Sequence, residues 1–403
     1  MPVNPCELRQ AVKAEAHRLG FQLVGITTPD QPAHYNVYQR WVQAGRHAQM
    51  DYLATDRALE CRQNLRLILP ECRSILMLGI RYDAPEIFSG TQHARSGYIE
   101  NEDDDLQPDI DERKPLYGRV AAYAWGEDYH DVLPERMAAL VAFIESNVGY
   151  KVPSRWYTDT GPILERDLAQ RAGLGWVGKN TCLINPNLGS YFLLGTILLG
   201  LELRPDEPFE HDRCGSCTRC IDVCPTACIL PDRTIDSRRC ISYLTIELKG
   251  SIPHELRKST GDWVFGCDVC QQVCPWNQRF ASMKGDPAFS VRHTISQPDL
   301  LDDLGLTPQS FNKLFKGSPL KRSKRRGYLR NVAVALGNKA DNTALSPLSN
   351  ALQEDAEPMV RAHAAWALGN IGGDSARAEL LQALEFERDE AVLIEIRAAL
   401  EIE

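Results

Sequence analysis

Nine of the thirteen cysteines in this 403-residue chain lie in one segment, between residues 214 and 274. The first run in the segment reads Cys214-x2-Cys217-x2-Cys220-x3-Cys224-Pro225. Bacterial ferredoxins use this spacing to hold cubane iron–sulfur clusters: three thiolates converge on one cluster, and the fourth cysteine, beside the proline, ligates the other. These residues therefore predict electron transfer, one electron at a time, through two clusters.

A second run, Cys267-x2-Cys270-x3-Cys274-Pro275, lacks the middle cysteine of the first run. By the ferredoxin exchange rule, we expect one cluster to be held by Cys214, Cys217, Cys220 and Cys274. The other is expected to be held by Cys224, Cys267, Cys270 and either Cys240 or Cys228. We favour Cys240, because Cys228 follows Cys224 so closely that both could reach one cluster only through a tight local turn. Zinc is the alternative for CxxC pairs, although zinc ribbons rarely show three evenly spaced cysteines and then Cys-Pro.

The overall composition is that of an ordinary soluble protein, with 43% hydrophobic residues, 25% charged residues and a formal charge of −9. No stretch reaches the roughly 18 apolar residues of a membrane span, and the start MPVNPCELRQ has neither a secretory nor a twin-arginine signal. We therefore expect a cytoplasmic protein without membrane contact, whose cysteines are metal ligands and reduced thiols rather than disulfides.

The first half of the chain has the pattern of a mixed α/β domain. Buried strands are predicted at 21–27, 74–80, 119–125 and 190–203, and helices at 4–20, 37–54, 130–147 and 162–172. Between the second and third strands, residues 84–117 include the acidic run ENEDDDLQPDIDER, for which we expect a mobile surface insertion.

Residues 158–184, TDTGPILERDLAQRAGLGWVGKNTCLI, form the second place where chemistry is expected. Their glycines permit tight turns and a close approach of the backbone to a flat or bulky ligand. The segment matches neither a Walker loop nor a dinucleotide fingerprint. Asp159 stands just before Thr160-Gly161-Pro162, where it could serve as a helix cap instead of a catalytic group.

Together these motifs resemble the epoxyqueuosine reductase family, which performs the last step of queuosine synthesis in tRNA. The resemblance rests on YAWGEDYH (123–130), residues 158–180, both cysteine runs, RCISYLTIELKG (239–250), and GRHAQMDYL (45–53) followed by RQNLRLILPECRSIL (62–76). It covers nearly the whole chain, and the acidic insertion departs from the family pattern.

The resemblance implies a nitroreductase-like cobalamin-binding domain, in an α+β or α/β fold related to that of the reductive dehalogenases. Two 4Fe-4S clusters would feed electrons to cobalt, and the absence of the DxHxxG signature implies that cobalamin binds base-off. By similarity, Asp159 is the proton donor, while Arg62, Lys179 and Asn180 lie in segments that border the corrinoid. The substrate would be tRNA carrying epoxyqueuosine, and the electrons would come from an external donor.

The reaction that the resemblance implies sets a requirement on Asp159. Removing the epoxide oxygen leaves an alkene and water, and consumes two electrons and two protons. The developing alkoxide has to be protonated or stabilised as it forms. A carboxyl group that is ordinarily ionised would have to be kept protonated by burial beside an apolar corrin face, or be recharged through water.

The end of the chain repeats the sequence Ala-Leu-Gly-Asn at a spacing of 32, in LRNVAVALGN (329–338) and RAHAAWALGN (361–370). This spacing predicts HEAT-like helical hairpins, with a merely packed helical tail as the alternative. Just before them, NKLFKGSPLKRSKRRGYLR (312–330) carries eight positive charges and no acid. We expect RNA to bind there, with Phe311, Phe315 and Tyr328 stacking on unpaired bases, unless the run is an ordinary solvated surface. The RNA-binding candidates are Lys321, Arg322, Lys324, Arg325 and Arg326.

The predicted protein is a monomer in three parts. Residues 1–205 form the cobalamin-binding catalytic domain, 206–290 a ferredoxin-like domain with two 4Fe-4S clusters, and 291–403 a basic linker and the HEAT-like repeats. A reductive dehalogenase and a ferredoxin with appended domains are the two rivals. Most of the former carry an export signal and need no basic tail, and the latter would bind no corrinoid.

Overall fold

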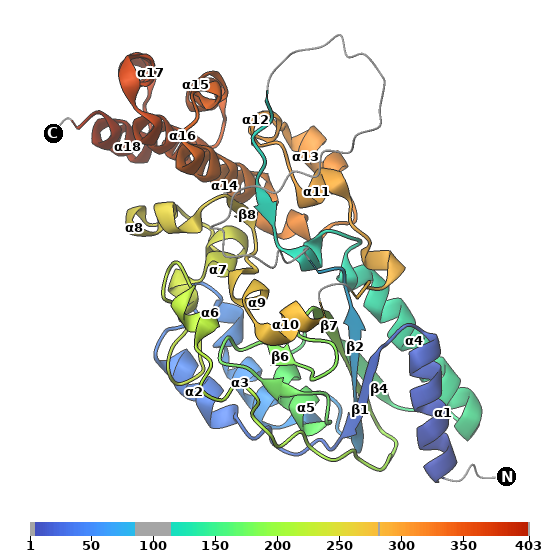
Figure 1. The fold of residues 1–403 in the computed structure, drawn as a ribbon. Coiled ribbons are helices and arrows are strands. Elements are labelled where there is room, and N and C mark those ends of the chain that lie inside the picture. Colours follow the sequence, from blue (N-terminus) through green and yellow to red (C-terminus); the bar gives the residue numbers. More distant parts are fainter. Residues whose placement is uncertain (1–4, 85–113, 281–282, 402–403) are drawn as a thin grey trace.

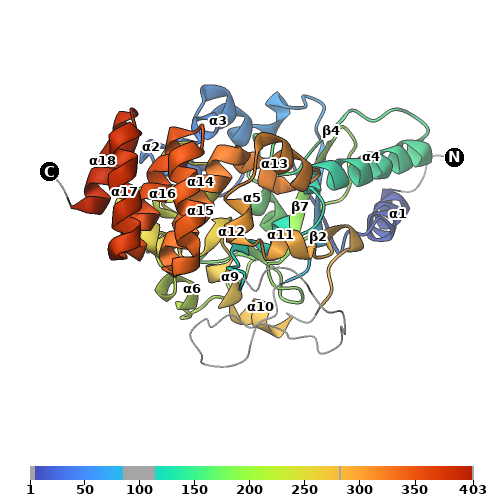
Figure 2. The same cartoon turned by 90° about the horizontal axis from the view of Figure 1, so that it is seen from above.

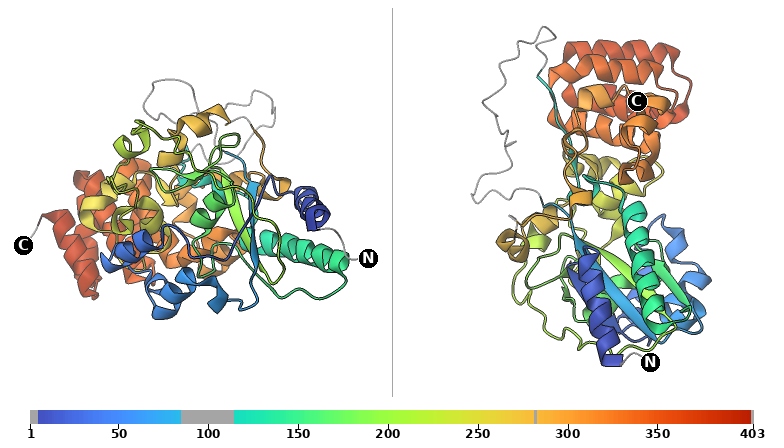
Figure 3. Two further views of the ribbon diagram at one scale, coloured as in Figure 1. Left: turned by 90° about the horizontal axis from the view of Figure 1, so that it is seen from below. Right: turned by 90° about the vertical axis from the view of Figure 1, so that its right-hand side faces the viewer.

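The computed structural model describes residues 5–84, 114–280 and 283–401. The prediction of an insertion at 84–117 therefore falls largely outside the described residues. The sheet-containing part lies at one end of the molecule, the cysteine segment in the middle and the helical repeats at the other end (Figure 1, Figure 3). Among the described residues, no helix has both the length and the apolar character that crossing a bilayer requires.

A four-stranded antiparallel sheet forms the core of the first part, in the order β1 (Leu23–Thr27), β2 (Ser74–Arg81), β7 (Phe192–Leu199) and β4 (Ser154–Tyr157). All eight residues of β2 are buried, because both faces of the sheet are covered. Leu76, Leu78 and Ile80 pack with α1 (Pro5–Arg18) and α4 (Tyr129–Val148). Ile75 and Met77 pack on the other face with α5 (Glu165–Arg171) and the turn after α3 (Asp56–Gln63). The fold is thus α+β.

Two predicted elements are corrected by the structure. Residues 119–125 form a strand only at β3 (Arg119–Val120), because the N–H of Ala122 donates to the buried Asp268 carboxylate instead of to a neighbouring strand. Of the helix predicted at 37–54, the structure forms α2 (Tyr35–Gln43). This helix ends at Gln43, and Gly45 and Ala48 after it adopt left-handed backbone angles. The strand β4 was not predicted.

The cysteine segment consists of short helices joined by the loops that carry the thiols. The helices are α6 (Arg219–Asp222), α7 (Ile241–Ile246), α8 (His254–Arg257), α9 (Val269–Gln272) and α10 (Pro275–Arg279). The strand β8 (Trp263–Phe265) pairs in parallel with β3 and so ties this segment to the first part. A small hairpin, β5 (Trp176–Val177) with β6 (Leu183–Ile184), precedes it in the chain.

The basic segment is helical rather than a linker, and it leads into the repeats. The helices α11 (His293–Ser296), α12 (Leu300–Asp303) and α13 (Pro308–Leu314) precede α14 (Lys324–Lys339). The repeats form two rows (Figure 1, Figure 2). One row contains α14, α16 (Pro358–Ile371) and α18 (Glu390–Leu400), and the other contains α15 (Leu345–Glu354) and α17 (Gly373–Phe386).

The repeated Ala-Leu-Gly-Asn explains how these helices stack. A Cβ atom at Gly337 would stand 2.8 Å from the backbone of Ala367, and one at Gly369 would stand 2.6 Å from the Ala399 side chain, so glycine allows both close approaches. The asparagine that follows Gly369 donates a hydrogen bond to the preceding helix of the same row. Asn370 Nδ2 donates to the Gly337 carbonyl at 2.7 Å.

The first repeat helix joins the cysteine segment through the same asparagine. Asn338 Nδ2 donates at 2.8 Å to the carbonyl oxygens of Arg257 and Gly261. Nearby, the buried guanidinium of Arg257 pairs with Glu395 at 2.6 and 2.9 Å. These contacts attach the repeats firmly to the cysteine segment.

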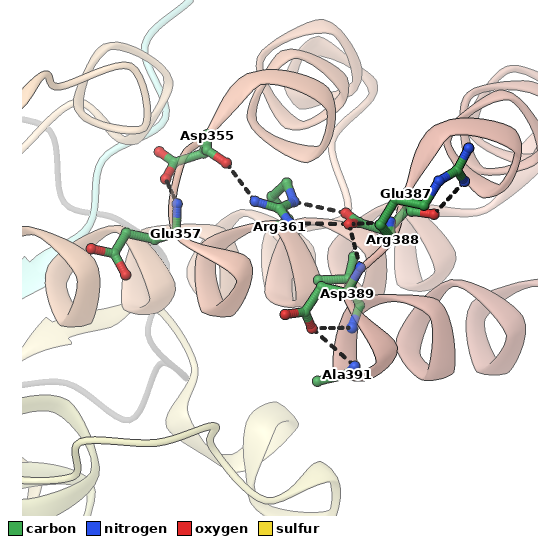
Figure 4. A network of polar contacts seen from close by, with 8 residues as sticks. Asp355, Glu357, Arg361, Glu387, Arg388, Asp389 and Ala391 are labelled. Carbon is green, nitrogen blue, oxygen red and sulfur yellow. Dashed lines mark hydrogen bonds and ion pairs between the residues drawn. The ribbon is translucent and has the colours of Figure 1, made fainter.

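Arg361 fixes the turns between repeat helices (Figure 4). Its guanidinium pairs with Glu387 at 2.7 and 3.0 Å and donates to the Asp355 carbonyl at 2.9 Å. The Glu387 carboxylate also accepts the N–H groups of Arg388 and Asp389. These contacts lower the pKa of Glu387 to about 2, against the opposing effect of its burial.

Candidate functional site

Four cysteines surround one cavity of about 230 Å³ in the cysteine segment. They are Cys214, Cys217, Cys220 and Cys274, the set that the exchange rule assigns to one cluster. Trp176 Nε1 donates a hydrogen bond to Cys214 Sγ at 3.4 Å. Hydrogen bonds to the sulfur ligands are one of the features that set the reduction potential of such clusters.

The remaining cysteines of the segment gather in a second group, which Cys182 joins. Cys224 Sγ lies 3.5 Å from Cys228 Sγ, and the thiols of Cys228 and Cys240 also interact. The thiols of Cys182 and Cys270 interact in the same way. The cysteines whose side chains the structure describes are all free thiols. In those ranges no three Cys, His, Asp or Glu side chains converge as the ligands of a single ion do.

Cys228 was not favoured as a cluster ligand because it could reach the same cluster as Cys224 only through a tight local turn. The structure corrects this reason. A tight turn does bring Cys228 to Cys224: Ala227 adopts a φ of 49°, and its N–H donates to the Cys224 carbonyl at 3.1 Å. Cys228 therefore sits in contact with both Cys224 and Cys240. Its hydrogen bond lowers the pKa of Cys224, which favours the thiolate form there.

Asp159 lies in the loop between β4 and α5. Its φ of 60° is left-handed, a conformation that Asp tolerates better than most residues. Its side chain is exposed, and Oδ2 accepts a hydrogen bond from the buried Tyr129 hydroxyl at 3.1 Å. Leu164, not Asp159, is the N-cap residue of α5, so the helix-cap alternative is wrong.

Glu165 supplies a second carboxyl group beside Asp159. Its Oε1 accepts the backbone N–H of Asp159 at 3.1 Å. Although part of its surface is exposed, protein surrounds the carboxyl, and this burial raises the pKa of Glu165 to about 8, with the charge of Asp159 as the next cause. Arg62 and Arg166 oppose the shift. Burial therefore favours the protonated form of Glu165.

Arg322 connects the basic segment to this carboxyl pair. Its guanidinium forms two hydrogen bonds with Glu247, at 2.9 and 3.0 Å. Glu247 is the first cause that raises the pKa of Arg322, and the charge of Asp159 also contributes. Tyr52 lies in the same cluster with 53% of its surface exposed. The cluster thus has an aromatic ring and a cation within electrostatic reach of Asp159.

Of the three residues predicted to border the corrinoid, Arg62 lies apart from Lys179 and Asn180. Arg62 is buried and its guanidinium stacks on Tyr38. Among the described residues it makes one hydrogen bond, from Nη1 to Ala58 O at 3.2 Å. Lys179 Nζ instead donates to the carbonyls of Gly215 and Cys217, at 2.8 and 2.9 Å. Lys179 and Asn180 both line the first cysteine cavity.

The basic segment is only partly available to a ligand. Lys321, Arg322, Lys324 and Arg326 are exposed. Arg325 is held by Asp355 at 2.5 Å and by the Leu306 carbonyl. The prediction that three aromatic residues stack on bases is wrong, because they are buried and pack on one another in the helical core: Phe311, Phe315 and Tyr328.

Sequence reasoning missed Tyr129 and Glu165 as partners of Asp159. Tyr129 lies within YAWGEDYH and Glu165 within TDTGPILER, so both were inside the motifs that carried the resemblance. The signal that could have found Glu165 is its place at the first position of a helix, six residues after Asp159. Its raised pKa depends on burial, which sequence does not show.

Three family profiles match the chain. Residues 62–160 match "Epoxyqueuosine reductase QueG, DUF1730", residues 213–277 match a 4Fe-4S double cluster binding domain, and residues 320–401 match HEAT repeats. The epoxyqueuosine reductase of Pseudomonas aeruginosa is 37% identical over 371 residues, which cover 92% of this chain and 96% of that protein. That of Escherichia coli is 35% identical over 398 residues, covering 98% and 94%.

Solved structures agree with these relatives. A crystal structure of epoxyqueuosine reductase with an epoxyqueuosine-modified stem loop of tyrosine tRNA has a TM-score of 0.86 at 30% identity and covers 99% of both chains. A Bacillus subtilis epoxyqueuosine reductase, with an aspartate catalytic loop swung out of the active site, has a TM-score of 0.83 at 29% identity, covering 99% of this chain and 100% of that one. The predicted double-cluster domain and HEAT-like repeats are confirmed.

Proposed function

Because this chain belongs to the epoxyqueuosine reductase family, we propose that it removes the epoxide oxygen from epoxyqueuosine in the anticodon loop of tRNA, with Asp159 as proton donor. The observation that carries this proposal is the carboxyl pair of Asp159 and Glu165, next to the exposed Arg322 of the basic segment. The direct test is to incubate the anaerobically reduced protein with epoxyqueuosine-containing tRNA. Mass spectrometry of the digested RNA should find the nucleoside without its epoxide oxygen, and unchanged epoxyqueuosine would refute the proposal.

Cobalamin is part of the proposal, and Arg62 fits it. A buried guanidinium has five donor N–H groups, and Arg62 uses one of them in a protein hydrogen bond. The remaining donors suit a group rich in oxygen acceptors, such as the amide side chains of a corrinoid. When bound, cobalamin would supply a strongly reduced cobalt that is nucleophilic toward the epoxide. Lys179 and Asn180 remain predicted corrinoid contacts, although their contacts here lie at the first cysteine cavity.

The positions of the sulfurs support the proposed cluster ligands. Thiolates that bind different corners of one cubane stand apart from each other, whereas Cys228 Sγ lies 3.5 Å from Cys224 Sγ and also interacts with Cys240. We therefore assign the second cluster to Cys224, Cys240, Cys267 and Cys270. Cys228 is then a neighbouring thiol that donates a hydrogen bond.

The expected result is that Cys240→Ala halves the iron content, because one of two four-iron clusters loses a ligand. Cys228→Ala, the matched control, should keep about eight irons per chain, the number in two four-iron clusters. Iron and acid-labile sulfide are measured on protein reconstituted under anaerobic conditions. The reverse pattern would assign the ligand to Cys228.

Glu165 completes the proposed chemistry, because deoxygenation needs two protons and a single carboxyl group delivers one. The side chain of Asp159 is exposed and therefore accessible to a substrate. Glu165 holds the backbone of Asp159 in place and carries a proton that can recharge it. The Tyr129 hydroxyl, whose pKa is raised by burial and by the charge of Asp159, stays protonated and donates to the Asp159 carboxylate.

We expect Glu165→Gln to reduce turnover at pH 7 by about tenfold or more, since glutamine keeps the acceptor oxygen but has no acidic proton. Glu165 has a raised pKa, so it holds its proton below about pH 8 and loses it above. Wild-type turnover should therefore fall as the pH rises through 8, and the variant should lack this limb. The pH profile is measured under single-turnover conditions. A profile identical to that of the wild type would leave Glu165 only a positioning role.

A further inference from the structure

The first cysteine cavity has a rim of positive charge. Arg213, Arg219 and Arg279 line it together with the four thiols, and all three side chains are exposed. Arg279 lies over the Trp276 ring at 5.0 Å, and Arg213 lies over Phe209 at 5.4 Å. Aromatic rings thus hold two of the guanidinium groups at the mouth of the cavity.

The charge of this rim is not neutralised by the protein. Within the described ranges, no ion pair joins Arg213, Arg219 or Arg279 to a carboxylate. The nearest acidic neighbour in sequence, Asp212, is already paired with Arg233 at 2.5 Å. These three exposed cations would attract a partner with negative charge.

The two cysteine groups differ in their surroundings. In the second group, Cys267 and Cys270 flank Asp268, and Tyr123 lies within the electrostatic reach of both Asp268 and Asp159. The first group instead borders the open cavity with its cationic rim. An electron carrier at the cationic rim would therefore face the first cluster.

We propose that the rim formed by Arg213, Arg219 and Arg279 is the docking surface for a small acidic electron-carrier protein, which reduces the first cluster. This inference rests on the proposed function, since the reaction needs an external reductant. The carrier is oxidised by one electron in each encounter, so two encounters supply the two electrons of one deoxygenation. The two protons reach the epoxide oxygen through Asp159, and the oxygen leaves as water.

The test uses a reduced plant-type [2Fe–2S] ferredoxin as the acidic carrier and the double variant Arg219→Glu/Arg279→Glu. The variant should bind ferredoxin at least about tenfold more weakly at low salt, with the difference shrinking as ionic strength rises. Its clusters should also be reduced more slowly by ferredoxin, as followed by the loss of visible absorbance. Turnover driven by dithionite, a small reductant that needs no docking, should equal that of the wild type.

The control variant Arg73→Glu/Arg155→Glu changes the net charge equally, at exposed positions of the sheet-containing part. It should bind ferredoxin as the wild type does. Equal weakening in both variants, unchanged binding in the rim variant, or a loss of tRNA affinity without a loss of ferredoxin affinity would overturn the docking surface. Wild-type protein that fails to deoxygenate tRNA with dithionite would overturn the proposed function instead.

Discussion

Replacing Asp159 by Asn should lower turnover of epoxyqueuosine-containing tRNA by on the order of 10² to 10⁴, the usual contribution of a positioned general acid. Asparagine tolerates the left-handed backbone of this position, and its amide oxygen can still accept the Tyr129 hydroxyl. The loop should therefore keep its shape and lose only its acidic proton. Single-turnover rates with reduced enzyme measure the effect.

The control for this prediction is Asp131→Asn, which removes an exposed carboxylate from the first turn of α4, close to Tyr129 in sequence. It should leave turnover unchanged. Both variants should keep the iron content of the wild type. Near-normal turnover in Asp159→Asn would show that another group protonates the oxygen, and Glu165 would be the first candidate.

The second large effect is expected in tRNA binding. Replacing Lys321, Lys324 and Arg326 together by alanine removes three exposed cations from the basic segment. Each cation that no longer neutralises a phosphate should lower the slope of log affinity against log salt by nearly one unit, so the slope should fall by up to about three. The dissociation constant is measured across a salt series, with cluster content as a check on folding.

A matched control changes three exposed cations at the other end of the molecule, Arg18, Lys151 and Arg155. This triple alanine variant should keep the wild-type slope. If both triples lower the slope equally, the RNA is bound by overall charge, and if neither does, its footprint lies elsewhere. Arg325 is left out because its replacement would break the ion pair with Asp355, and a change in stability would obscure the result.

The grouping of the cysteines was predictable because their spacing within each short run determines it. Short spacings such as Cys214 to Cys217 determine which thiols share a loop, and the structure gathers the first predicted set around one cavity. The HEAT-like hairpins were predictable for a similar reason, because Gly337 and Gly369 repeat at a fixed spacing. In both cases, a fixed spacing in the sequence corresponds to contacts in the structure.

The basic segment shows where sequence reasoning fails. Its aromatic residues looked available for bases, yet Tyr328 is buried and donates to the buried Asp303. Arg330 belongs to the same charged run, but it is fully buried and its guanidinium binds the carbonyls of the α7 helix and the loop after it. Which residues of a helix face inward depends on what packs against it, and α14 packs on both the cysteine segment and the repeats. Only tertiary structure reveals that.

The hydrogen bonds from Asn338 to the cysteine segment show what covers the first helix of the repeats. Stacked helical repeats need terminal units that cover their open faces. Here Asn370 bonds back to α14 as Asn338 bonds back to Arg257 and Gly261. The iron–sulfur segment thus acts as the capping unit of the solenoid. Because α14 is bonded to the cysteine segment in this way, we expect loss of a cluster to loosen the basic helix α14 as well.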